Sequence, residues 1–100
     1  MFGSRPMSSW IQQYASSHQH PLNRLLHTIG IPAIVVAILL APASVAWPSL
    51  RLPAAMLFIG GWVLQFIGHA VEGKRPEFFT DWRFLFVGVR WWIAKVRGEA

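Results

Sequence analysis

The sequence predicts an all-α membrane protein: a two-span antiparallel helical hairpin with an N-terminal polar helix start and a C-terminal amphipathic interfacial helix. Three observations predict this fold class. Of 100 residues, 54% are hydrophobic and only 13% are charged. Two long stretches carry no charge, and the cations gather outside them. A chain of this length holds one small domain, so residues 1–100 are expected to form a single membrane domain.

The composition excludes several classes of protein. The chain has no cysteine, so it forms neither disulfides nor a thiolate metal site. Six Trp and seven Phe rule out a disordered chain. The net charge of +5 on so apolar a chain fits anionic lipid headgroups better than phosphates of a nucleic acid. The expected partner is therefore a membrane, with no nucleic acid.

The two charge-free stretches define the predicted spans, at about residues 28–50 and 52–71. About 20 residues, at roughly 1.5 Å each, cross a hydrocarbon core of about 30 Å, so each stretch is long enough. Helices of a soluble bundle would keep a polar face, and Ile34 to Ala41 has none. Pro32 and Pro42 are expected to kink the first span.

The segments beside the hairpin have patterns of their own. Pro21 suits the first turn of a helix capped by His20 or a neighbour, and this polar helix start leads into the first span. After a break near Gly73, residues about 77–97 are expected to form an amphipathic helix in the headgroup region, anchored by Trp91 and Trp92. A third helix packed on the hairpin is the alternative interpretation of that segment.

The cations predict the orientation of the hairpin. Two arginines precede the first span, six cations follow the second, and one arginine lies between them. Positive charge stays on the cytoplasmic side, so we expect a multi-pass membrane protein with both termini cytoplasmic. Gly60 and Gly61 are typical of a helix-packing surface, either within the hairpin or between subunits of a homo-oligomer.

A small set of polar residues interrupts the apolar chain near the ends of the spans: His18, His20, Asn23, His27, Gln65, His69 and Glu72. Asn23 and His27 share one helix face, and Gln65, His69 and Glu72 share another, because they are spaced by three or four residues. His27 and His69 each lie 21 residues from Pro48, so a hairpin that turns there brings them to one level. Stranding such groups in lipid costs several kcal/mol, which makes them functional candidates.

Clustered imidazoles near a carboxylate, without cysteine, suit iron, zinc or copper, and with open coordination positions they fit a non-haem iron(II) centre. The candidate metal ligands are His18, His20, His27 and His69. Asn23 and Gln65 are expected to orient the ring nitrogens, with Glu72 beside them. Two other interpretations stay open: a haem held between His27 and His69, and a non-catalytic membrane scaffold whose histidines only form hydrogen bonds at the interface.

Two motifs resemble the Mpo-like family of small membrane proteins. One is His-Gln-His-Pro-Leu-Asn-Arg-Leu-Leu-His at residues 18–27, followed by Gly-Ile-Pro at 30–32. The other is Gly-Trp-Val-Leu-Gln-Phe-Ile-Gly-His at residues 61–69, followed by Glu72 and Lys-Arg-Pro at 74–76. The resemblance covers about residues 14–80.

This resemblance implies an iron(II)-dependent dioxygenase. The implied reaction is α-oxidation, in which a 2-hydroxy fatty acid and dioxygen give a fatty acid one carbon shorter without a 2-oxoacid cosubstrate. His18, His27 and His69 match the catalytic histidines of the motif, and Asn23 and Gln65 match its amides. The substrate carboxylate is expected to pair with Arg24, Lys74 or Arg75, whose alternative role is to anchor the hairpin at the cytoplasmic surface.

Overall fold

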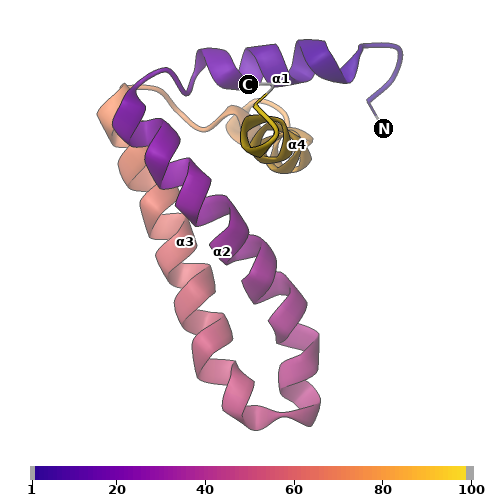
Figure 1. The fold of residues 1–100 in the computed structure, drawn as a ribbon, viewed down its shortest axis with the longest axis vertical. Helices are drawn as coiled ribbons and strands as arrows, with labels where there is room; N and C mark the ends of the chain where they lie inside the picture. The colour runs from indigo at the N-terminus through magenta and orange to yellow at the C-terminus, as the bar shows by residue number, and fades with distance from the viewer. Residues whose placement is uncertain (1, 99–100) are drawn as a thin grey trace.

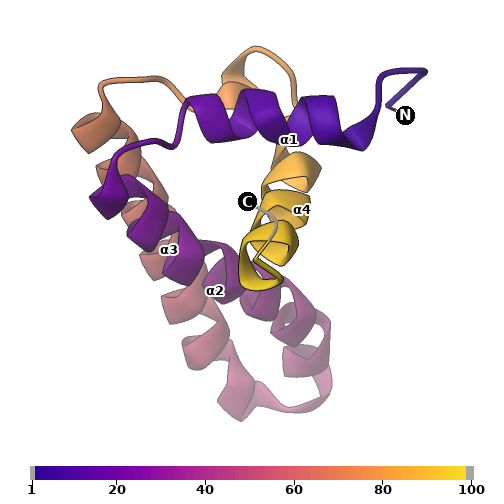
Figure 2. The same cartoon turned by 45° about the horizontal axis from the view of Figure 1, so that its top comes forward.

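A computed structural model describes residues 2–98, and every regular element in that range is a helix. The elements are, in order, α1 (Met7–Ser16), α2 (Pro21–Ala46), the short 3-10 helix η1 (Pro48–Leu50), α3 (Arg51–Glu72), the 3-10 helix η2 (Glu77–Phe79) and α4 (Phe84–Val96). The two long helices α2 and α3 lie side by side, α1 extends away from the open end of this pair, and α4 packs below α1 (Figures 1 and 2).

Two helical segments are long and apolar enough to cross a membrane, by length and composition. They are Pro21–Ala46, with a mean hydropathy of 2.4, and Pro48–Glu72, with a mean hydropathy of 1.6. The first helix begins at Pro21, where the backbone N–H of Leu22 donates to Nδ1 of His20 and so caps the helix, as the sequence predicted. It continues through both internal prolines to Ala46.

Glycines let α2 and α3 approach closely. A methyl group at Gly61 would lie 2.9 Å from the carbonyl oxygen of Gly30 and 2.7 Å from Cγ1 of Ile34, whereas one at Gly60 would meet nothing within 4 Å. Gly61 thus belongs to a packing surface within the hairpin. A homo-oligomer stays a prediction.

The helix α1 has no counterpart among the elements that the sequence predicted. Its Trp10 and Tyr14 pack with Phe84, Val87 and Trp91 of α4 in one buried cluster. Trp91 is 0% exposed, so it is a core residue and not the interfacial anchor that was expected. The helix α4 packs against α1 and α2, as in the alternative of a third helix packed on the hairpin. Its position in the headgroup region stays a prediction.

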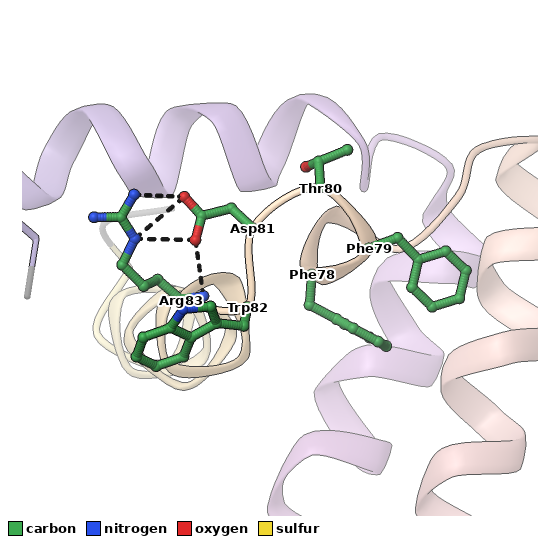
Figure 3. Close-up of a pocket in the computed structure, with 6 residues that line it drawn as sticks. All are labelled: Phe78, Phe79, Thr80, Asp81, Trp82 and Arg83. Carbon is green, nitrogen blue, oxygen red and sulfur yellow. Dashed lines mark hydrogen bonds and ion pairs between the residues drawn. The ribbon is translucent and has the colours of Figure 1, made fainter.

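The expected helix over residues 77–97 is divided in the structure. Between η2 and α4, the Asp81 carboxylate accepts a hydrogen bond of 3.1 Å from the backbone N–H of Arg83 and pairs with its guanidinium at 2.7 Å (Figure 3). A short acidic side chain that binds the backbone two residues later competes with helical hydrogen bonding. The regular helix therefore starts only at Phe84.

Candidate metal centre

Three histidines from separate segments meet where α1, α2 and α3 join. His18 follows the end of α1, His27 lies on the second turn of α2, and His69 lies on the last turn of α3. One ring nitrogen of each lies within 4.8 Å of the others, and all three residues are buried. In Figure 1 this is the upper end of the hairpin, next to the loop that leaves α1.

The surroundings of His18 leave one ring nitrogen available. Its Nδ1–H donates to the carbonyl oxygen of Tyr14 at 2.6 Å, and its ring stacks on the Tyr14 ring with centroids 4.1 Å apart. Its Nε2 is buried and has no hydrogen-bond partner among the described residues. Burial lowers the pKa of His18 to about 4, although the Tyr14 carbonyl partly opposes this shift. At neutral pH the ring is therefore uncharged, the form that binds metals.

His27 and His69 face each other with their Nε2 atoms 3.2 Å apart. The Asn23 carbonyl accepts from Nδ1–H of His27 at 3.1 Å, which assigns the lone pair to its Nε2. Two nitrogens that each bind one ion at about 2.1 Å lie about 3 Å apart when their bonds are nearly perpendicular. The spacing of this pair already fits one ion, and the orphaned Nε2 of His18 completes a three-nitrogen donor set.

Asn23 and Glu72 fasten the segments that carry the histidines. The Asn23 amide Nδ2 donates to the Ser17 carbonyl at 3.3 Å and to Oε1 of Glu72 at 3.2 Å. The same carboxylate oxygen accepts from the backbone N–H of His20 at 2.8 Å. Glu72 therefore ties α3 to the start of α2, outside the group of three rings.

A cavity of about 410 Å³ adjoins the histidines. Its polar lining comes from Tyr14, His27, Gln65, His69 and Glu77. Gln65 is only 5% exposed, and its Nε2 lies beside Gly30 of α2. Isoleucine, valine and leucine side chains of α2, residues of α4, and the aromatic rings of Trp62 and Phe78 line the remainder.

The other expected site residues lie apart from the three rings. His20 is exposed, and its Nδ1 accepts the cap hydrogen bond, so it does not join the cluster. Arg24 is half-buried with its guanidinium 6.0 Å from the centre of the Trp91 ring. Lys74 donates to the Ser16 carbonyl at 3.1 Å, and Arg75 is exposed.

A second hollow, lined by the segment from Phe78 to Arg83, lies beside the Asp81–Arg83 ion pair (Figure 3). No histidine lines it. It therefore has no part in the metal centre.

Sequence reasoning missed the residues that surround His18. Tyr14 stacks on its ring, the Ser17 hydroxyl lies 3.0 Å from its Nδ1, and Trp91 has its ring centroid 5.8 Å away. Tyr14 comes four residues before His18, and this spacing is the signal that could have found it.

The model of a family described as 2-hydroxy-palmitic acid dioxygenase Mpo1-like matches residues 4–100. No curated protein and no solved structure matches the chain significantly. The family match confirms the resemblance carried by the two histidine motifs.

Proposed function

Because the chain belongs to the Mpo1-like family, described as 2-hydroxy-palmitic acid dioxygenases, we propose that it is a membrane-bound, iron(II)-dependent dioxygenase. It converts a 2-hydroxy fatty acid and dioxygen to a fatty acid one carbon shorter. Both termini lie in the cytoplasm, as the excess of cations outside the hairpin favours.

The observation that carries this proposal is the convergence of three buried imidazoles. His18, His27 and His69 would hold the ion through ring nitrogens that lie within 4.8 Å of one another. Histidine nitrogens without a thiolate suit a non-haem iron(II) centre that keeps open positions. When bound, iron(II) supplies the one-electron chemistry that activates dioxygen.

The residues of the chain have separate roles in this reaction. The carbonyls of Tyr14 and Asn23 fix the tautomers of His18 and His27 and aim their free nitrogens at the centre. Gln65 and Tyr14 offer hydrogen bonds inside the cavity for the hydroxyl and carboxylate oxygens of the substrate. Arg24, whose charge acts on His18, is the candidate partner of the carboxylate, ahead of the exposed Arg75.

The reaction needs no further reductant. Conversion of R–CH(OH)–COOH and dioxygen to R–COOH, carbon dioxide and water balances in atoms and electrons. The bond between the carboxyl carbon and C2 breaks, C2 is oxidised to a new carboxyl carbon, and dioxygen is reduced. Burial of the histidines excludes bulk water from this chemistry.

The geometry does not favour a haem between His27 and His69. Axial ligands occupy opposite faces of a porphyrin, so the macrocycle would have to separate the two rings. Here Nε2 lies 3.2 Å from Nε2, and close glycine contacts join α2 to α3 one turn further along. The non-catalytic scaffold is the alternative that the experiment below tests.

The test uses purified protein in detergent, reconstituted with iron(II) and supplied with 2-hydroxypalmitate. We expect oxygen uptake and release of the acid one carbon shorter, with no turnover of palmitate, which lacks the hydroxyl. His27→Ala should abolish turnover, whereas the matched control His20→Ala should keep it, because His20 lies outside the cluster. Iron-loaded protein that takes up no oxygen and makes no shorter acid would overturn the proposal in favour of a scaffold.

A further inference from the structure

The cavity beside the histidines is polar at one end and apolar along the rest of its length. Its polar lining comes from Tyr14, His27, Gln65 and His69, together with Glu77, whose charge acts on Tyr14. The apolar lining follows one face of α2 from Ile31 to Leu39. A cavity with this gradient fits an amphiphile whose head lies at the histidines and whose tail follows α2.

The dimensions fit one acyl chain. His27 and Leu39 are twelve residues apart, which is about 18 Å along the helix axis. This length is close to the hydrocarbon thickness of one leaflet, about 15 Å, and so to the length of a lipid tail. The volume of the cavity, about 410 Å³, leaves room for an acyl chain along this stretch of α2.

The far end of the cavity is open. Ile38 and Leu39 on α2 are 56% and 69% exposed, and Leu85 and Phe86 on α4 are 43% and 51% exposed. These side chains belong to the cavity lining, and they would face lipid when α2 crosses the bilayer. A tail could therefore enter sideways between α2 and α4 without leaving the hydrocarbon region.

We propose that this cavity is a lateral acyl-binding channel: a single acyl chain enters from the bilayer between α2 and α4 and is held along α2, with its polar head at Gln65 and His69. The inference rests on the proposed function for the identity of the occupant, a 2-hydroxy fatty acid. Because the far end is open, the channel sets a minimum tail length and no maximum. Binding should strengthen with chain length until the tail reaches Leu39, and then become constant.

The test is photolabelling of metal-free protein in lipid nanodiscs, so that its outcome does not depend on turnover. Two 2-hydroxy fatty acids carry a diazirine, one near the head and one at the tail end, and mass spectrometry locates the labelled residues. We expect the head probe to label residues around Trp62 and Gln65, and the tail probe to label Ile38, Leu39 and the facing residues of α4.

Matched variants show whether labelling occurs inside the channel. Val35→Trp fills the cavity and should reduce tail labelling about tenfold, whereas Val36→Trp, beside it but outside the lining, should leave labelling unchanged. Ile38→Trp obstructs the exposed end of the channel and lies outside the buried cluster of α1 and α4. It is the second blocking variant, to be used if Val35→Trp does not fold.

The two proposals fail in different ways. Labels spread over the outer face of α3, around Val63 and Ile67, and unaffected by Val35→Trp or Ile38→Trp, would overturn the channel even if the enzyme turns over. Specific labelling of the channel in a protein without turnover would support the channel and contradict the proposed reaction.

Discussion

Gly68→Ala should damage the metal centre without touching a histidine. A methyl group at Gly68 would overlap Oδ1 of Asn23, and it would lie 3.1 Å from Cγ of Asn23 and 3.3 Å from Cε1 of His27. Asn23 cannot easily move away, because its amide is bonded to both Ser17 and Glu72. We therefore expect α3 to shift outward and to carry the adjacent His69 away from His27.

The size of the effect follows from two opposed contributions. Overpacking a buried contact costs about 1–3 kcal/mol, while alanine gains about 1 kcal/mol over glycine in helix propensity. Gly60→Ala is the matched control, because its methyl group meets nothing within 4 Å and only the propensity gain remains.

Thermal unfolding in detergent and iron(II) titration measure the two consequences. We expect Gly68→Ala to melt below Gly60→Ala and to bind iron about tenfold more weakly. Equal melting temperatures together with equal iron affinities in the two variants would refute this account of the Asn23 contact.

Three further predictions concern Glu72, the buried core and His20. Glu72→Ala should lower the free energy of unfolding by about 1 kcal/mol. Glu72→Gln should lower it by less, because an amide oxygen still accepts from His20 and Asn23. The Glu72→Gln variant should keep its bound iron, and a loss of iron from it would identify Glu72 as a ligand. Trp91→Ala should lower the free energy of unfolding by about 3–5 kcal/mol, since the Trp91 side chain is fully buried. Trp82→Ala is the control, and it should change the melting temperature little because Trp82 is 59% exposed. Equal changes in melting temperature in the two variants would contradict the assignment of Trp91 to the core. His20→Ala removes the helix cap and should lower the free energy of unfolding by about 0.5–2 kcal/mol, with no change in bound iron. A lower iron stoichiometry in the folded variant would show that His20 is a metal ligand after all.

The sequence predicted the parts of the site that depend on helical spacing. Asn23 with His27, and Gln65 with His69, each repeat after four residues, so a helix brings each amide to the face of its histidine. The helical class and the two apolar helices followed from composition and from the length of the charge-free stretches.

The remainder depends on contacts between distant segments, which periodicity does not report. The helix α1 is short, and its buried residues Trp10 and Tyr14 pack on α4, about 75 residues further along the chain. The pattern of residues 77–97 favoured an amphipathic interfacial helix, and it could not show that Trp91 faces α1. His20 and Glu72 are residue types that often bind metals. Only the three-dimensional arrangement shows that His20 caps α2 and that Glu72 joins α3 to the start of α2 through a hydrogen bond.

Iron stoichiometry tests the central claim most directly. Elemental analysis after reconstitution with iron(II) and removal of excess metal should find one iron per chain in the wild-type protein and in His20→Ala, and far less in His18→Ala, His27→Ala and His69→Ala. His18 is the decisive position, because it is the one proposed ligand that comes from outside the hairpin. Full iron occupancy in folded His18→Ala, or no iron in the wild-type protein, would contradict a centre built from all three histidines.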